Sequence, residues 1–553
     1  MTIDRRQALA LIGLGAATPA AAAETAKAGG VKFLHGVASG DPKTDRVILW
    51  TRITPDQAGG QVAYRWRLTP VDRRGGGARR GAGVTGPERD YTAKVDVAGL
   101  EPGRAYTYEF EAAGVTSPMG RTHTLPAGPV KDYVLAYASC ALYPNGYFNA
   151  YQAIADLDRV DLIIHLGDYI YEYGGEKSYG MDSAVAAHRP HDPPHECVSL
   201  ADYRRRHAQY KSDPALQAAH ARAPWIVAWD DHETANDSYK YGAENHQPAT
   251  EGDWATRKAA ALKAYFEWQP IREPAKGQSL AEAGARSFAI GDLATLVMLE
   301  TRLTARTRQL TYEHDLPVAD GKPDLAGFEK KWKDPAHRMM SPGQEAWLGH
   351  ELETSVKGGQ AWQVIASGVV MGRLKVPDPA KELTAEQIAA LAPDAQRRVK
   401  RMAGPSALGL PYGLDMWDGY PADRERVYDR IKAAHARPIV ISGDSHAFWA
   451  NELSDAAGQR VACEFGGTSI TSPGADDYFK GVQMGPMFVK VSPEVKFCDQ
   501  AAKGFVRLTL SHGEARGDLM AVSTIGSKDF KTTVLKSFRV TPEGTGLSAL
   551  RET

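Results

Sequence analysis

The sequence predicts an all-β N-terminal domain followed by a large α/β domain. Residues 33–125 hold short alternating apolar runs separated by Gly, Pro and Asp turns, which is typical of β-strands. After residue 130, apolar strand-like runs alternate with helical stretches, a pattern that favours an α/β fold. The chain has 553 residues and 43% hydrophobic residues. Because single cores seldom exceed ~250–300 residues, more than one domain is expected.

Residues 1–28 have the layout of an export signal. Arg5 and Arg6 precede an apolar stretch over residues 8–17 and a small-residue region ending near Ala23. We interpret this as a twin-arginine signal, with the twin-arginine translocase as a transient partner and a periplasmic or secreted location. Export of an unfolded chain by the general route is the alternative. No later segment reaches the ~20 apolar residues of a membrane span, so we expect no stable membrane anchor.

Residues 31–126 are predicted to form one β-sandwich. Its strands are expected in the runs VILWTRI, VAYRWRL, YTAKVDV and AYTYEFEA. The segment from Leu100 to Tyr108 resembles the tyrosine-bearing turn of fibronectin and immunoglobulin-like sandwiches. The arginines at 73–74 and 79–80 lie among glycines and are interpreted as a solvated loop.

Residues 130–553 are predicted to form the α/β domain. The stretches with helical periodicity are residues 148–157, 200–210, 254–268, 342–352 and 422–434. Loops over residues 172–198 and 303–340 are long enough to be lids or walls of a site.

Charge and cysteine content exclude several classes of protein. Lys and Arg number 66 against 67 Asp and Glu, so the net charge near −1 gives no support for specific nucleic-acid or membrane-surface binding. We instead expect a phosphoester substrate, which is either a small molecule or a polymer. Four cysteines are too few for a disulfide framework, although one pair among Cys197, Cys463 and Cys498 remains possible.

Four apolar runs stop abruptly at residues that bind metals. Central strands of an α/β sheet deliver such side chains to their carboxyl edge, where ligands bind. One junction alone is equally well explained by a turn, but four together are not. The candidate ligands are Cys140, Asp168 and Tyr171, Asp231 and Asn236, and Asp444 and His446.

The ligand types suggest two different ions. A phenolate from Tyr171 is a hard ligand that favours a trivalent ion such as Fe³⁺. Asp and Asn oxygens suit Ca²⁺, Mg²⁺ or Mn²⁺ better than zinc. Two neighbouring ions can activate a water and clamp the oxygens of a phosphoryl transfer, which predicts phosphoester hydrolysis without a protein nucleophile.

Five segments together carry a family resemblance. They are SGDPKTDRVILWTR, ASCALYPNGYFNAY, LIIHLGDYIYEY, WDDHETANDS and SGDSHAFWANEL. These segments resemble those of the alkaline phosphatase D (PhoD) family, relatives of the purple acid phosphatases within the calcineurin-like metallophosphoesterases. The resemblance covers nearly the whole chain after residue 28 and implies a four-layer α/β/β/α sandwich behind the N-terminal domain. It further implies hydrolysis of phosphodiesters and phosphomonoesters by a metal-bound hydroxide at a dinuclear Fe/Ca site.

The same resemblance implies a division of the ligands. Fe³⁺ would be held by Cys140, Asp168, Tyr171 and His446. Ca²⁺ would be held by Asp168, Asp231, Asn236 and Asp444.

Further residues are candidates for contact with the phosphate. His232 follows Asp231 as a histidine follows the metal-binding asparagine of purple acid phosphatases, so it would polarise the phosphate or protonate the leaving oxygen. A role in orienting Asp231 explains it equally well. Tyr203 and Arg204, or one of the two following arginines, would contact phosphate unless they form a solvated helix face. Arg302 would bind phosphate or pair with Glu300 or Asp292.

Three alternatives stay open at this stage. The protein would be a phospholipase D-like diesterase specialised for lipid or cell-wall phosphodiesters, or an extracellular binding module whose α/β domain is not catalytic. A dinuclear hydrolase acting on amides or lactones is disfavoured, because such sites usually carry histidine clusters that this chain lacks.

Overall fold

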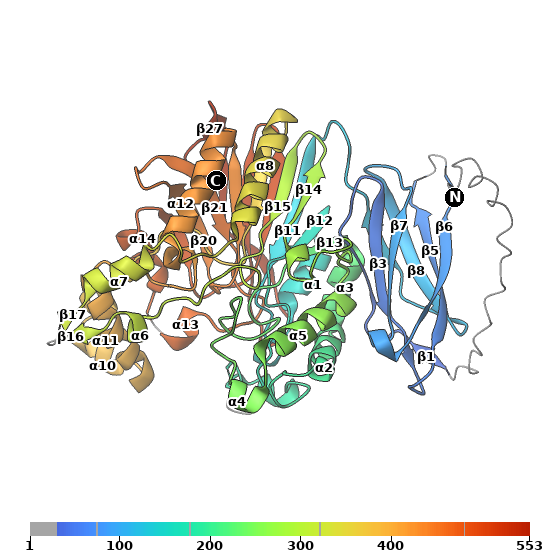
Figure 1. Ribbon diagram of the computed structural model, residues 1–553, viewed down its shortest axis with the longest axis horizontal. Coiled ribbons are helices and arrows are strands. Elements are labelled where there is room, and N and C mark those ends of the chain that lie inside the picture. The colour runs from blue at the N-terminus through green and yellow to red at the C-terminus, as the bar shows by residue number, and fades with distance from the viewer. Residues whose placement is uncertain (1–29, 73–75, 176–178, 320–321, 480–481) are drawn as a thin grey trace, which may run out of the picture.

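The computed structural model describes residues 30–72, 76–175, 179–319, 322–479 and 482–553 (Figure 1). The predicted export signal and Arg73–Arg74 lie outside these residues. In the described part of the chain, no helix is both long and apolar enough to cross a membrane.

A ten-stranded mixed sheet runs through most of the molecule. Strands β11, β12, β13 and β2 are parallel neighbours, and the strands on either side of this group are antiparallel. The order is β28 (Arg551–Glu552), β25 (Thr532–Val540), β24 (Ala515–Val522), β23 (Lys503–Ser511), β11 (Asp132–Ala138), β12 (Leu162–His165), β13 (Trp225–Val227), β2 (Val37–Gly40), β3 (Arg46–Arg52) and β7 (Thr92–Ala98).

A seven-stranded sheet lies against the first. Strands β15, β18, β19 and β21 are parallel. One buried cluster takes Leu135 and Ile164 from the first sheet and Leu296 and Ile441 from the second, so the two sheets share a core. Burying each such side chain contributes roughly 1.5–3 kcal/mol. The order is β14 (Arg286–Ile290), β15 (Ala294–Met298), β18 (Trp362–Ala366), β19 (Pro438–Ser442), β21 (Arg460–Gly466), β20 (Phe448–Ser454) and β22 (Val495–Asp499).

Helices cover the outer faces of both sheets, and each predicted helical stretch contains one. Ile154 and Leu216 pack with Ile163 of the ten-stranded sheet, and Leu352 packs with Val440 of the other. On the first face lie α1 (Asn149–Ala155), α2 (Leu200–Lys211), α3 (Pro214–Arg222) and α5 (Trp254–Trp268), and on the second α8 (Pro342–Lys357) and α12 (Pro421–Ala434). Side-chain caps fix several starts, such as the reciprocal bonds between Ser199 and Asp202.

A lobe of short elements projects from the second sheet (Figure 1). Its core contains Leu310, Phe328, Leu410 and Leu414, so the segment predicted as a long loop over residues 303–340 is partly helical. The lobe holds α6 (Tyr312–Asp315), β16 (Val318–Ala319), β17 (Lys322–Pro323), α7 (Leu325–Trp332), α9 (Pro379–Glu382), α10 (Ala385–Ala390) and α11 (Pro393–Ala407). The remaining short elements are β1 (Val31–Lys32), β4 (Thr54–Pro55), α4 (Pro248–Glu251), α13 (Ala475–Tyr478), α14 (Met484–Val491), β26 (Pro542–Glu543) and β27 (Gly546–Leu547).

The N-terminal domain pairs two sheets around Leu49, Val62, Tyr108 and Phe110. The first is β2-β3-β7, and the second is β10 (Gly120–His123), β8 (Ala105–Ala112), β5 (Val62–Pro70) and β6 (Arg79–Thr85), with β9 (Val115–Thr116) beside β8. The predicted strand runs all form strands. The Tyr106 hydroxyl accepts a hydrogen bond from the Glu101 backbone N–H at 3.2 Å.

One sequence prediction in this domain is corrected. Arg79 and Arg80 begin strand β6 rather than a loop. The glycines of β6 weaken its sequence signal, but they are needed because a Cβ at Gly81 would lie 2.6 Å from the Trp66 ring. The N-terminal domain contributes strands to the sheet of the α/β domain, since Gly40 of β2 pairs with Trp225 of β13 in the ten-stranded sheet.

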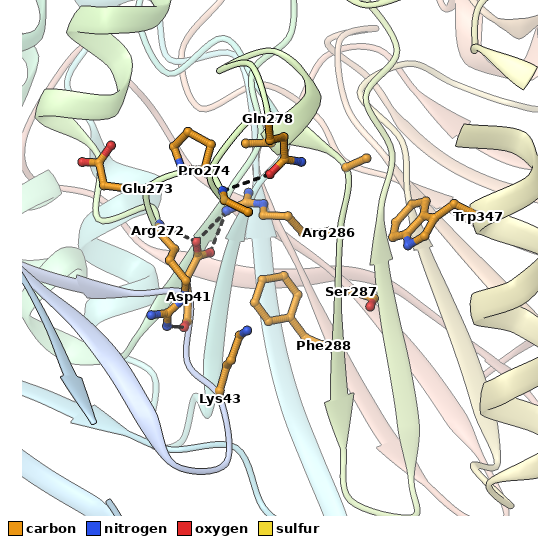
Figure 2. Close-up of a pocket in the computed structure, with 13 residues that line it drawn as sticks. Asp41, Lys43, Arg272, Glu273, Pro274, Gln278, Arg286, Ser287, Phe288 and Trp347 are labelled. Atoms are coloured by element: carbon orange, nitrogen blue, oxygen red, sulfur yellow. Dashed lines mark hydrogen bonds and ion pairs between the residues drawn. The ribbon is translucent and has the colours of Figure 1, made fainter. Parts of the chain in front are cut away.

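Ionic contacts line the junction between the domains. A cavity of about 430 Å³ opens there, with Asp41, Lys43 and Arg272 on its wall (Figure 2). Asp41 accepts hydrogen bonds from the Arg286 guanidinium at 2.7 Å and from the Arg272 backbone at 2.6 Å. The four cysteines are buried and free, so the disulfide considered among Cys197, Cys463 and Cys498 is not formed.

Candidate metal centre

The four predicted junctions meet where the two sheets face each other. β11, β12 and β13 are parallel in one sheet, and β19 is parallel to its neighbours in the other, so their carboxyl ends lie at common edges. The two edges touch: a Cβ on Gly443 after β19 would lie 2.6 Å from the Ser139 hydroxyl after β11. The sheets therefore deliver residues more than 300 positions apart to one place.

Three overlapping groups of side chains can hold metal ions there. Within each group, the candidate ligand atoms lie within 4.8 Å of one another. The groups are Cys140, Asp168 and His446; Asp168, Asp231 and His232; and Asp230, Asp231 and Asp444. Asp168 and Asp231 each belong to two groups, which is the arrangement that a bridging carboxylate requires.

The backbone at these junctions is unusual. Cys140, Asp168, Asp444 and His446 have φ values of 61°, 56°, 62° and 56°, in the left-handed region. A non-glycine residue held there costs about 1–3 kcal/mol, and such residues cluster at functional sites. Before Asp168, Gly167 is required because its Cβ would lie 2.4 Å from Cβ of Asp230.

On one side of Asp168, three further atoms that can bind a metal lie close together. They are Cys140 Sγ, the Tyr171 hydroxyl oxygen and His446 Nε2. The Tyr171 hydroxyl donates to Asp168 Oδ2 at 2.9 Å, lies 3.4 Å from His446 Nε2, and accepts from the Ser472 hydroxyl at 2.6 Å. The Pro473 carbonyl accepts from His446 Nδ1 at 2.7 Å, which leaves Nε2 unprotonated and facing the cluster. Burial and the nearby Lys503 lower the pKa of His446 to about 3.

Without a cation, the thiol of Cys140 stays protonated. Burial raises its pKa well above the ordinary value, and the carboxylates of Asp168 and Asp444 raise it further. A cation in the centre reverses this effect, because a metal favours the thiolate.

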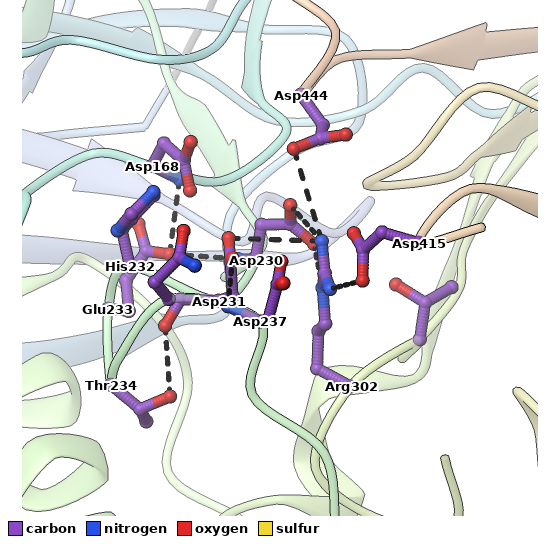
Figure 3. A network of polar contacts seen from close by, with 12 residues as sticks. Asp168, Asp230, Asp231, His232, Glu233, Thr234, Asp237, Arg302, Asp415 and Asp444 are labelled. Carbon is purple, nitrogen blue, oxygen red and sulfur yellow. Dashed lines mark hydrogen bonds and ion pairs between the residues drawn. The ribbon is translucent and has the colours of Figure 1, made fainter. Parts of the chain in front are cut away.

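On the second side, carboxylates crowd around one guanidinium (Figure 3). Arg302 is fully buried and binds Asp230 with two hydrogen bonds of 2.6 and 2.8 Å. It also donates to Asp415 at 2.8 Å and lies 3.8 Å from Asp231 and 4.0 Å from Asp444. The predicted pairing of Arg302 with Glu300 is wrong for the guanidinium, since the hydrogen bond from Arg302 to the Glu300 carboxylate comes from its backbone N–H.

The positive charge of one arginine does not neutralise the negative charges of this group of carboxylates. Burial raises the pKa of both Asp168 and Asp444 well above the ordinary value, and neighbouring carboxylates such as Asp231 and Asp230 add to it. Oδ1 of Asp168 and Oδ1 of Asp231 are buried and have no hydrogen-bond partner in the part of the chain that the structure describes. Buried carboxylate oxygens without donors are expected where cations bind, so these residues fit a metal centre.

His232 forms a buried pair with Glu172. Its Nδ1 lies 2.7 Å from a Glu172 oxygen, whose other oxygen accepts from the Asn236 backbone and the Asn245 amide at 2.8 Å. Burial opposes protonation of His232, but Asp231 and Glu172 outweigh it and raise its pKa well above the ordinary value. His232 can therefore carry a proton beside the carboxylate cluster.

Glu233 fixes the loops that carry the ligands. Its carboxylate accepts from the backbone N–H groups of Asp168 at 3.1 Å, Tyr169 at 2.6 Å and Asp230 at 2.8 Å. Four residues of this centre have no role predicted from the sequence: Glu233, Glu172, Asp230 and Asp415. Glu172, Asp230 and Glu233 lie inside the quoted motifs, which was the available signal, whereas Asp415 lies outside any motif.

Three predicted site residues lie elsewhere or face away. The buried Tyr203 hydroxyl donates to the Thr234 carbonyl and accepts from Arg257 at 3.0 Å, so it supports the loop below His232. Arg204 binds Glu267 at 2.7 Å and the Glu88 backbone of the N-terminal domain at 2.9 Å, which corrects its predicted contact with phosphate. The Asn236 amide donates to Glu244 at 3.1 Å.

Comparison with known proteins agrees with this geometry. Residues 135–519 match the PhoD-like phosphatase family, and residues 18–126 match the N-terminal domain of PhoD-like phosphatases. Alkaline phosphatase D of Bacillus subtilis (strain 168) is 32% identical over 536 residues, covering 94% of this chain and 83% of that protein. A solved structure of PhoD is 31% identical, with a TM-score of 0.76 over 94% of this chain and 92% of its own. The chain therefore belongs to the PhoD-like phosphatase family and is a phosphoric ester hydrolase.

Proposed function

We propose that this protein is an exported phosphoesterase that hydrolyses phosphodiesters and phosphomonoesters at a mixed Fe³⁺/Ca²⁺ centre. The observation that supports it best is the chemistry on the two sides of Asp168. A thiol, a phenol and an imidazole lie on one side, and mainly carboxylates lie on the other. The first set suits a trivalent transition ion, and the second suits a hard divalent ion.

In this proposal, Cys140, Asp168, Tyr171 and His446 hold the iron, and Asp168, Asp231 and Asp444 hold the calcium. Asn236 completes the calcium site if its side-chain amide no longer donates its hydrogen bond to Glu244. When bound, two such cations neutralise the phosphoryl oxygens and lower the pKa of a bound water. We further propose that the two facing sheets with outer helices correspond to the four-layer α/β/β/α sandwich, and that the N-terminal domain is fibronectin-like.

The residues of the chain supply the proton transfer. His232, held by Glu172 at 2.7 Å, donates a proton to the leaving oxygen as the ester bond breaks. Glu172 fixes the ring and stabilises its charge, as a carboxylate does for a general acid. Arg302 keeps Asp230 and Asp415 paired, so that Asp231 and Asp444 remain available to cations.

The test replaces Asp168 with Asn, which keeps the shape but removes the charge shared by both ions. We expect activity on a monoester and on a diester to fall together, by at least about 10³-fold, on the scale of lost metal-centred electrostatics. The matched control is Asp45→Asn, because Asp45 is an exposed carboxylate paired with Arg46 in the N-terminal domain. Full activity of Asp168→Asn would overturn the proposed centre.

Export is tested separately. Replacing Arg5 and Arg6 with lysines keeps the charge but removes the guanidinium pair, so we expect the protein to remain inside the cell. Normal secretion of this variant would instead support the general route for unfolded chains.

A further inference from the structure

A second cavity lies where the lobe meets the start of helix α12. Its volume is about 380 Å³. None of the residues in the three ligand groups of the metal centre lies on its wall, so the two sites are distinct. Part of the wall is apolar and consists of Trp332 from α7, Leu374, Pro411 and Pro421. The rest of the wall is polar and contains several charged side chains.

A buried arginine on this wall has donors without acceptors. The side chain of Arg424 is 3% exposed. Its Nη1 donates to Asp418 Oδ1 at 2.6 Å and to the Met371 carbonyl at 3.2 Å. Among the described residues, neither Nε nor Nη2 has a hydrogen-bond partner. Nε and Nη2 form the fork with which a guanidinium binds a carboxylate through two parallel hydrogen bonds, so an acceptor is expected here.

The start of α12 faces the same cavity. Pro421 and Ala422, the first two residues of this 14-residue helix, lie on the wall. The N-cap residue, Tyr420, provides no side-chain cap. In the part of the chain that the structure describes, the backbone N–H of Ala422 makes no hydrogen bond. A helix start with free N–H groups carries partial positive charge and binds anions, so it adds to the effect of Arg424.

The other charges on the wall favour a ligand with one negative charge. Two carboxylates line the cavity, but Asp418 is paired with Arg424, and Glu425 accepts from Arg373 at 2.5 Å. Lys375 is exposed on the wall and has no carboxylate within ion-pair distance among the described residues. Because the two carboxylates repel a doubly charged phosphate more strongly than a carboxylate, a monocarboxylate fits better.

The apolar part of the wall is held in a fixed shape. The Trp332 indole donates from Nε1 to the Asp418 carbonyl at 2.6 Å, and its ring stacks on Phe328 with ring centres 6.0 Å apart. The backbone N–H of Tyr412 donates to the Leu374 carbonyl at 2.6 Å, which joins the two loops of the wall. A preformed apolar wall of this kind binds a flat ring with little loss of conformational freedom.

We propose that this cavity binds an organic monocarboxylate with a flat apolar body. The Arg424 fork and the start of α12 hold the carboxylate, and the body packs against Trp332 and Pro411. The inference does not depend on the proposed function, because the wall contains none of the candidate metal ligands.

The test is titration calorimetry of the full-length, metal-loaded protein with 2-naphthoate, which joins a carboxylate to a flat ring system. Three further ligands separate the parts of this probe. 2-Naphthalenemethanol has the ring without the charge, acetate has the charge without the ring, and inorganic phosphate offers a different anion.

Two variants change the anion site. Arg424→Lys keeps the charge but removes the fork. Because this change also disturbs the pair with Asp418, the second variant is Ala422→Asp, which leaves Arg424 in place and adds a negative charge at the start of α12. An acidic residue in the first turn is compatible with the helix. The matched control is Lys330→Gln, at an exposed position of α7 outside the wall.

We expect 2-naphthoate to bind the wild type with a Kd below about 1 mM, and the three other ligands to bind at least about tenfold more weakly. Each of the two variants should raise the Kd for 2-naphthoate at least about tenfold, since one repels the carboxylate and the other cannot form two parallel bonds. Lys330→Gln should stay within about twofold, because an exposed charge contributes little.

Several results would overturn the inference. They are no binding of 2-naphthoate in the millimolar range, equal affinity in the wild type and both variants, binding of the alcohol as tight as that of 2-naphthoate, and tighter binding of phosphate. Asp168→Asn separates this cavity from the metal centre, and we expect it to leave the Kd for 2-naphthoate within about twofold. Loss of 2-naphthoate binding in Asp168→Asn but not in Ala422→Asp would place the ligand at the metal centre and contradict the inference.

Discussion

At the scale of single residues, the positive charge of Arg302 allows the carboxylates of the centre to lie close together. It is fully buried and is surrounded by Asp230, Asp415, Asp231 and Asp444. Breaking one partner out of a buried ion pair typically costs 3–5 kcal/mol, because the remaining charge has no compensation.

We therefore expect Arg302→Met to lower the free energy of unfolding by about 3–5 kcal/mol. The free energy of unfolding of Arg302→Lys should lie between those of Arg302→Met and the wild type. Lysine keeps the charge, but it cannot bind Asp230 with two parallel hydrogen bonds. Urea unfolding of the three proteins in the same metal buffer is the measurement. A Met variant as stable as the wild type would show that Arg302 does not hold these acids.

Tyr171 supports a second prediction at this scale. A phenolate bound to Fe³⁺ absorbs visible light, so Tyr171→Phe should remove or shift the colour of the protein while iron is retained. Tyr173→Phe is the matched control, because its ring centre lies 6.2 Å from that of Tyr171 and it is not one of the proposed ligands. Unchanged visible absorbance in Tyr171→Phe with full iron content would exclude Tyr171 as a ligand.

The site residues that could be predicted from the sequence are those with a local signal. Asp168 and Asp444 each end a short β-branched run, so their position at a sheet edge follows from neighbouring residues. The role of Asp415 depends on a contact with Arg302, which is 113 positions away, and no local pattern records it. Arg204 was misjudged for the same reason: its partner Glu267 lies on α5, which packs against α2 only in the folded chain.

At the scale of elements, the loops after β12 and β13 depend on each other through Glu233. One carboxylate accepts three backbone N–H groups from both loops. Burial raises the pKa of Glu233 to about 7, so its negative charge is most complete above neutral pH. The negative form binds the three donors best, because ionised acceptors make the stronger hydrogen bonds.

Glu233→Gln should therefore weaken the anchoring of both loops while the hydrophobic core stays packed. We expect a loss of about 1–3 kcal/mol in unfolding free energy, the cost of a buried donor left without its acceptor. Hydrogen exchange should increase at the backbone amides of Asp168, Tyr169 and Asp230. Glu282→Gln, a change at an exposed carboxylate, serves as the control. Exchange rates equal to those of the wild type at these three amides would contradict the anchoring role.

The elements themselves were largely predictable, and their exceptions have physical causes. The helix over residues 254–268 was predicted with its observed bounds, because its apolar period and Asp253 cap are both local. Strand β6 was missed because Gly81 and Gly83 have low strand propensity, and only the rings of Trp66 and Tyr64 beside them explain the glycines. The pairing of β2 with β13 joins strands from two predicted domains and has no sequence signature.

At the scale of the whole molecule, a group of buried bases lies where the N-terminal domain meets α2 and β12. Lys211 is 1% exposed, contacts His220 at 3.1 Å, and has the rings of Trp50 and Tyr169 nearby. Burial lowers the pKa of His35, His165 and His207 to about 3, with the charges of neighbouring bases such as Lys211 adding to the effect. These three histidines are neutral in the fold.

The protein should consequently be sensitive to acid. An unfolded histidine has a pKa near 6.5, so between pH 6.5 and about 3 the unfolded chain binds more protons than the fold. Stability is then complete above pH 6.5 and decreases as the pH falls through this window. Each such histidine contributes a slope of at most ~1.4 kcal/mol per pH unit.

His207→Leu tests this prediction, because both ring nitrogens of His207 are buried and find no hydrogen-bond partner among the described residues. Urea unfolding followed from pH 8 to pH 5 should show the same stability trend as the wild type above pH 6.5, and below pH 6.5 a slope that is shallower by about 1 kcal/mol per pH unit. His314→Gln, at an exposed position, should leave the slope unchanged. Equal slopes in His207→Leu and the wild type would mean that His207 is not kept neutral by the fold.

The central claim is that one site selects two different metals, and elemental analysis of the purified protein tests it most directly. We predict close to one iron per chain that survives gel filtration, together with calcium that EGTA removes. Activity should disappear with the calcium and return when Ca²⁺ is added, while the iron stays bound by its thiolate and phenolate ligands. Stoichiometric zinc without iron, or full activity after removal of both metals, would contradict the account.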